Sequence, residues 1–123
     1  MKEISSTIEY NGKEYKMIFN LNVMQEIQDE YETLGKWGAL TDGTALDANG
    51  NQIGEPNIKA LVFGFTAMMN EAIDIDNEKN GTNEPFLTRK TVSRMISEIG
   101  IENVTKNMNQ LVIDSTKSDE KNS

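Results

Sequence analysis

The sequence contains no cysteine and no histidine, and these two absences exclude much of protein chemistry. Without cysteine there can be no disulfide, no thiolate nucleophile and no zinc site of the Cys/His type. Without histidine, the commonest general acid–base group near neutral pH is missing. We therefore expect a protein that is not an enzyme, with no catalytic residues, no metal and no cofactor.

Positive charge is also scarce, since 12 Lys and Arg stand against 20 Asp and Glu, for a net charge of −8. A protein that binds nucleic acid or an anionic membrane depends on clustered basic residues, so we expect neither partner. The longest apolar run, residues 60–69, is too short to span a bilayer, and residues 1–10 lack the apolar core of a signal peptide. We expect a soluble protein that stays in the cytoplasm.

The clearest local pattern lies in residues 3–20, EISSTIEYNGKEYKMIFN. Asn11-Gly12 is the preferred pair for a two-residue type I′ turn, which places Tyr10 opposite Lys13. The alternation of side chains then predicts a β-hairpin with one apolar face. Its members are Ile4, Ile8, Tyr10, Tyr15, Met17 and Phe19.

Apolar residues at helical spacing predict the remaining elements. We expect Asn22 and Gln25 to form a capping box at the first helix, and Thr88 to cap the third. The predicted fold is α+β, mainly α, with the hairpin packed on a bundle of about four helices in a single domain, 1–114. The expected segments are helices at about 22–36, 57–78, 88–99 and 102–114, a flexible loop at 38–56, and a disordered tail at 115–123.

Residues 76–87, DNEKNGTNEPFL, have the polar spacing of an EF-hand calcium loop, with glycine at its sixth position. Position 8 is Asn83 instead of an apolar residue, and position 12 is Leu87 instead of the bidentate Glu. We therefore interpret the segment as a polar connection between two helices. Carboxylates on the first helix, such as Glu26 and Asp29, are expected on its solvated face rather than in an acid–base pair.

Three apolar residues are candidates for contact with a partner. Phe63 falls outside the main apolar stripe of the second helix, and Met69 offers a pliable side chain. Trp37 lies beside the glycine-rich loop, where it either contacts a partner or is buried beneath that loop.

Several stretches of the sequence resemble the tail assembly chaperones of long-tailed phages and prophages of Gram-positive bacteria. They are YNGKEYKMIFNLNVMQEI, IKALVFGFTAMMNEA, LTRKTVSRMISEIG and IENVTKNMNQLV. The resemblance covers about residues 8–34 and 58–113. It implies a non-virion protein of the bacterial host cytoplasm that binds the tape measure protein and helps recruit tail tube subunits. In that family, a longer form of the protein made by ribosomal frameshifting is common.

Because tape measure proteins are long and rich in helix, we expect an amphipathic helix to lie in a groove beside the second helix, with Phe63 and Met69 contributing. A virion structural protein, such as a head–tail connector or tail tube component, is the alternative. A small calcium-binding regulatory protein is a further one. The sequence leaves a homo-oligomer open.

Overall fold

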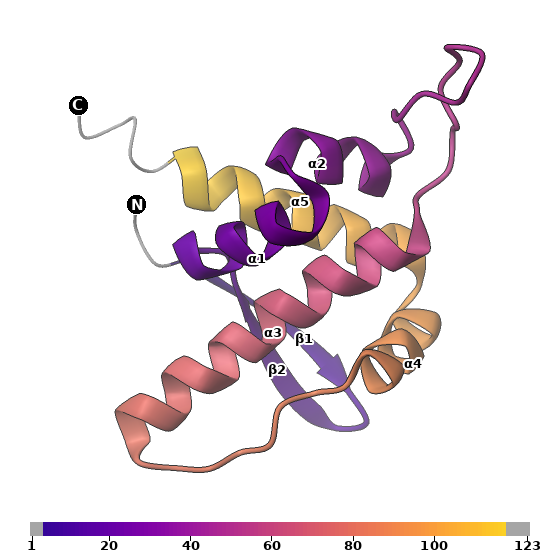
Figure 1. Ribbon diagram of the computed structural model, residues 1–123. Coiled ribbons are helices and arrows are strands. Elements are labelled where there is room, and N and C mark those ends of the chain that lie inside the picture. Colours follow the sequence, from indigo (N-terminus) through magenta and orange to yellow (C-terminus); the bar gives the residue numbers. More distant parts are fainter. Residues whose placement is uncertain (1–3, 118–123) are drawn as a thin grey trace.

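The computed structural model describes residues 4–117, and Figure 1 shows a β-hairpin and five helices within them. The fold is α+β and mainly α, as predicted. The two strands form one antiparallel sheet, and the helices are arranged around its inner face and its ends. The elements are β1 (Ser5–Tyr10), β2 (Lys13–Ile18), α1 (Leu21–Tyr31), α2 (Leu34–Asp42), α3 (Ile58–Asn80), α4 (Arg89–Ile99) and α5 (Ile101–Lys117).

The hairpin has the predicted turn and register. Asn11 and Gly12 have φ values of 53° and 76°, as a type I′ turn requires, and Tyr10 pairs with Lys13. On the predicted apolar face, Ile8, Met17 and Phe19 are buried. Ile4, Tyr10 and Tyr15 are partly buried against the same core. Residue 3 of the predicted hairpin lies outside the described residues.

The predicted helix 22–36 is wrong, because the chain forms two helices there. The cap of α1 is Asn20 instead of Asn22, and its side chain accepts a hydrogen bond from the Val23 amide at 3.2 Å. Glu32 then takes a left-handed φ of 74° and ends α1. Thr33 caps α2 by accepting from the Lys36 amide at 3.0 Å. The turn between α1 and α2 therefore depends on a positive φ at Glu32, a conformation that residues other than glycine rarely adopt.

The predicted loop 38–56 begins too early, because α2 continues to Asp42. The connection that follows is a narrow ribbon held by backbone hydrogen bonds. Gly54 donates to Gly43 O at 2.8 Å, and Ile53 donates to Ala45 O at 2.9 Å. At its tip the chain turns around Asn49-Gly50, where the Gly50 amide donates to Asp47 O at 3.1 Å. At its base the Asn57 amide donates to Leu40 O at 2.7 Å, which ties the end of the ribbon to α2.

The long helix α3 is the centre of the molecule and packs against β2, α1, α2 and α4. Asn57 caps its start and Gly81, at φ 64°, ends it. Its innermost side chains have exposed fractions of 1% or less: Ala60, Leu61, Phe65, Met68 and Met69. Ile58, at its first position, is 50% exposed and lies outside the core.

The last two helices close the core. Thr88 caps α4, as predicted, and Gly100 ends it. α5 runs to Lys117 and buries Ser115, so the prediction that a tail begins at 115 is wrong for residues 115–117. The rest of that predicted tail lies outside the described residues. Within residues 4–117, no helix is both long and apolar enough to cross a membrane.

Candidate partner-binding grooves

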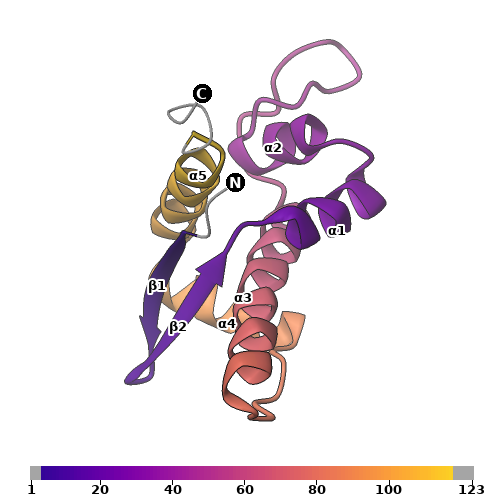
Figure 2. The same cartoon turned by 90° about the vertical axis from the view of Figure 1, so that its left-hand side faces the viewer.

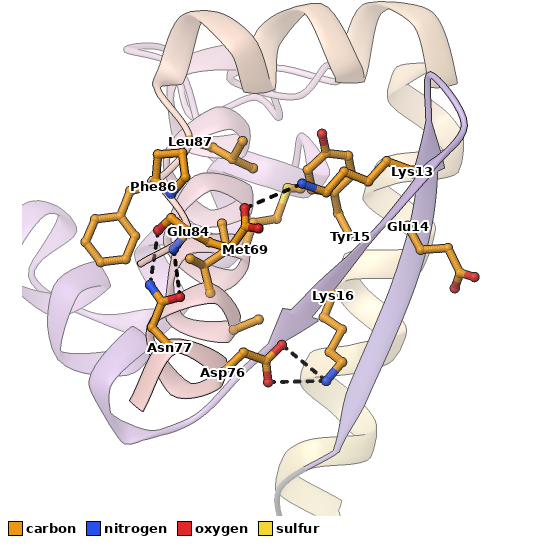
Figure 3. Close-up of a pocket in the computed structure, with 13 residues that line it drawn as sticks. Lys13, Glu14, Tyr15, Lys16, Met69, Asp76, Asn77, Glu84, Phe86 and Leu87 are labelled. Carbon is orange, nitrogen blue, oxygen red and sulfur yellow. Dashed lines mark hydrogen bonds and ion pairs between the residues drawn. The ribbon is translucent and has the colours of Figure 1, made fainter. Parts of the chain in front are cut away.

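A groove of about 310 Å³ lies between β2 and the second half of α3, and we call it the hairpin groove (Figure 3). One wall is the stretch 13–16 of β2, and the other is the extended segment 84–87 that follows α3. The side chains from α3 that line it are Met69, Ala72, Ile73, Asp76 and Asn77. Its floor is apolar, since Met69 and Ala72 are buried and Leu87 is partly buried.

Two ion pairs span the hairpin groove, one from β2 to α3 and one from β2 to the segment 84–87. Lys16 Nζ lies 3.4 Å from an Asp76 carboxylate oxygen, and Lys13 Nζ lies 3.7 Å from one of Glu84. Lys13 also lies 5.2 Å from the centre of the Tyr15 ring. The four side chains of the ion pairs are between 42% and 62% exposed, so each pair contributes only about 0–1 kcal/mol. The charged side chains at the rim of the groove are therefore held in place only weakly by these ion pairs.

The wall formed by residues 84–87 is fastened to α3 by two asparagines. Asn77 accepts from the Glu84 amide at 2.9 Å and donates to Glu84 O at 3.1 Å. Asn70 does the same with Leu87, at 2.8 Å and 3.0 Å. Each side-chain amide thus satisfies both backbone groups of one residue, which holds the segment extended along the helix.

A second groove, of about 590 Å³, lies where the start of α3 meets the end of α4 and the start of α5, and we call it the isoleucine groove. Ile58 and Ile101 flank it at 50% and 40% exposure, and Val62 and Ile96 form its buried floor. The remaining lining residues are Ser93, Ser97, Gly100, Glu102 and Asn103. Ser97 Oγ donates a hydrogen bond to Ser93 O at 2.9 Å. An apolar partner that covered the groove would therefore not leave the Ser97 hydroxyl without a hydrogen-bond partner.

Trp37 is a core residue with an exposed fraction of 3%, which agrees with the second of its two expected roles, burial beneath the loop. Its Nε1 donates to Ala60 O at 2.9 Å. Its ring lies over Gly64, where a Cβ would come within 2.3 Å of Trp37 Cζ2. Ala60 and Gly64 form a smooth side of α3, and this small-residue pair was the sequence signal for an aromatic ring packed there.

Phe63 and Met69 do not share a groove, which contradicts the expected site. Met69 is 1% exposed and lies beneath the hairpin groove, whereas Phe63 borders a different hollow beside Glu26 and Arg89. Six positions on a helix turn the side chain by about 240°, which separates the two. Phe63 is partly buried, and its ring meets Tyr31 edge-on at 5.5 Å. Met69 is therefore a packing residue, and Phe63 alone stays reachable.

Three titratable groups in α1 and at its C-terminal cap have shifted pKa values. Burial raises the pKa of Glu26, and the nearby carboxylates of Glu71 and Asp29 raise it further. Burial also raises the pKa of Tyr31. The hydrogen bond from Lys36 lowers the pKa of Glu32. Glu26 and Asp29 are exposed, as predicted for a solvated face.

The EF-hand-like spacing at 76–87 does not form a calcium loop. Its first five positions belong to the last turns of α3, and Asp76 instead pairs with Lys16. Among residues 4–117, no three acidic side chains gather closely enough to hold a metal ion. Its remaining positions, 81–87, lie in the connection between α3 and α4, so the expected helix–helix connection is shorter than the segment.

No family model, no curated protein and no solved structure matches this chain.

Proposed function

We propose that this protein is a phage tail assembly chaperone, which binds the tape measure protein and helps recruit tail tube subunits in the bacterial host cytoplasm. It acts by covering apolar surface of another chain rather than by catalysing a reaction. The proposal draws on the sequence resemblance and on the grooves described above.

The observation that carries the proposal is the pair of exposed isoleucines around the isoleucine groove. Ile58 and Ile101 lie at the first positions of α3 and α5, and the floor between them is apolar. An amphipathic helix places apolar residues at intervals of three and four positions, which suits a groove of this kind. The small side chains of Ser93 and Ser97 allow such a helix to come close. This placement replaces the one expected from Phe63 and Met69.

Co-expression with the tape measure protein of the same gene cluster tests the proposal. The wild-type protein should co-purify with it and keep it soluble, and the Ile58→Ser/Ile101→Ser double variant should lose most of that binding. The matched control is Leu21→Ser/Leu46→Ser, since both leucines are 63% exposed and lie outside both grooves. Equal loss in both variants, or no co-purification of the wild type, would contradict the proposal.

The virion alternative predicts a different result. A head–tail connector or tube component would be present in purified particles, whereas a chaperone would be absent from them. Mass spectrometry of particles from a strain that makes this protein separates the two.

A further inference from the structure

The hairpin groove borders the free edge of β2. β2 pairs with β1 on one side only, because the sheet has two strands. The two-residue turn makes Tyr10 and Lys13 the hydrogen-bonded pair that closes the hairpin. Because hydrogen-bonded and non-bonded pairs alternate in an antiparallel ladder, the backbone groups of Glu14 and Lys16 point away from β1. They lie on the side of β2 that has no neighbouring strand among residues 4–117.

That side opens into the groove. The four consecutive residues 13–16 all line it, although their side chains alternate between the two faces of the strand. Figure 3 shows the Glu14 carboxylate pointing away from the groove. The groove therefore meets Glu14 through its backbone, as expected at a strand edge.

The backbone groups at this edge have no partner among the described residues. Within residues 4–117, no hydrogen bond joins the backbone of Glu14 or Lys16 to any element outside the hairpin. An edge of unpaired amides and carbonyls is a template for another extended chain. The ligand chemistry that it recognises is an extended polypeptide backbone.

We propose that the hairpin groove binds an extended segment of the partner polypeptide, which pairs with β2 as a third strand. This rests on the proposed function, and it adds a second mode of contact to the helix in the isoleucine groove. α3 and the segment 84–87 stand on the far side of the groove. A strand that paired with β2 would lie about 4.8 Å from it, on the side where α3 and the segment 84–87 form the opposite wall. The proposed occupant is one strand of another chain.

When no strand is bound, the two ion pairs disfavour non-specific pairing at the edge of β2. Lys13 and Lys16 reach across the groove to Glu84 and Asp76, and charged side chains of this kind keep free edges from pairing indiscriminately. Because all four side chains are exposed, an incoming strand displaces them at little cost. Apolar side chains on one face of that strand would then contact Leu87 and Ile73.

Lys16→Pro is the sharpest test of this pairing. Proline removes the outward amide of Lys16 and leaves the bonds between β1 and β2 in place, since edge strands accept proline where the N–H faces solvent. Lys16→Ala removes the ion pair but keeps the amide. Thr7→Pro is the matched control, because Thr7 lies directly opposite Lys16 and its amide faces the other edge of the hairpin. Circular dichroism checks that each variant is folded.

Binding to immobilised tape measure protein should weaken about tenfold or more for Lys16→Pro and by less than about twofold for the two controls. Equal affinity of Lys16→Pro and Lys16→Ala would overturn the proposal, although wild-type binding would leave the proposed function intact. Failure of the wild-type protein to bind would instead remove the proposed function.

A measurement on the unaltered protein covers the case in which Lys16→Pro does not fold. Overlapping 12-residue peptides of the tape measure protein are screened for binding, and the best binder is resynthesised with single backbone N-methyl groups. Methylation at alternate amides should abolish binding, and methylation at the amides between them should not. Equal tolerance at every position would overturn the proposal.

Discussion

Asn70 and Leu87 exchange two hydrogen bonds, one in each direction, at 2.8 Å and 3.0 Å. An asparagine side chain carries the same donor and acceptor as a peptide unit, so this contact is equivalent to one rung of a β-ladder. Asn77, about two helical turns further along α3, repeats it with Glu84. A helix thereby holds an extended segment in place, and that segment forms one wall of the hairpin groove.

Replacing Asn70 with alanine should destabilise the protein by about 1–3 kcal/mol, because it leaves both backbone groups of the partly buried Leu87 without a partner. Asn77→Ala should cost less, since Glu84 is exposed and water can replace the amide. Urea unfolding measures both values, and hydrogen exchange should show faster exchange of the Leu87 amide in Asn70→Ala. Unchanged exchange there would contradict the role of Asn70.

Gly64→Ala should destabilise the fold by about 1–3 kcal/mol, because the added methyl group would come within 2.3 Å of the Trp37 ring. The matched control is Gly38→Ala, which also lies inside a helix but has no atom within 4 Å of the new Cβ. Alanine there should stabilise by about 0.5–1 kcal/mol. Thermal unfolding of the two variants should give shifts of opposite sign, and shifts of the same sign would argue against the packing of Trp37 on Gly64.

Asn20→Ala should cost more stability than Thr88→Ala, for which about 1 kcal/mol is expected from loss of a helix cap. Asn20 also caps α1, and in addition it donates to a Glu71 carboxylate oxygen at 2.7 Å. Asn20→Asp keeps the cap but faces Glu71 with a second negative charge, so it should regain stability only when the pH is lowered. Denaturant unfolding at pH 7 and pH 4 checks this ordering.

Glu26→Gln should stabilise the protein at pH 7 by up to about 0.5 kcal/mol, as expected for an exposed position. The pKa of Glu26 is raised in the folded protein, so the folded state binds its proton more tightly than the unfolded chain does. Stability is therefore lost as pH rises from the ordinary value of 4.5 through the folded pKa. Below 4.5 the carboxyl is neutral in both states, and the substitution should have little effect there. If Glu26→Gln were less stable than the wild type at pH 7, the charged form of Glu26 would stabilise the fold, contrary to this prediction.

The parts of the fold that depend on neighbouring residues could be predicted from the sequence. Asn11-Gly12 sets its own turn and thereby the register of the hairpin, and Thr88 and Gly100 mark the ends of α4. The break between α1 and α2 could not be predicted, because glutamate favours helix and nothing local announces the left-handed φ of Glu32.

The candidate site depends on contacts between residues distant in the sequence, which explains why the sequence did not show that Phe63 and Met69 border different hollows. Asn70 and Asn77 have the pattern of surface polar residues on a helix, and only the return of the chain after Gly81 brings Leu87 and Glu84 to them. A methionine at position 69 is compatible with a pliable surface contact and with the buried floor of a groove. Helical periodicity does not distinguish between these two roles. Phe63 is the one predicted contact residue that the fold leaves within reach.

The position of the protein's single tryptophan provides a built-in optical reporter. The indole of Trp37 is shielded from water and touches α3 at Ala60 and Gly64, so its emission should shift to longer wavelength only when α2 separates from α3. The hairpin groove is lined by neither Trp37 nor any residue of α2. Fluorescence titration could therefore distinguish a variant that has lost affinity from one that has lost its fold, without any added label.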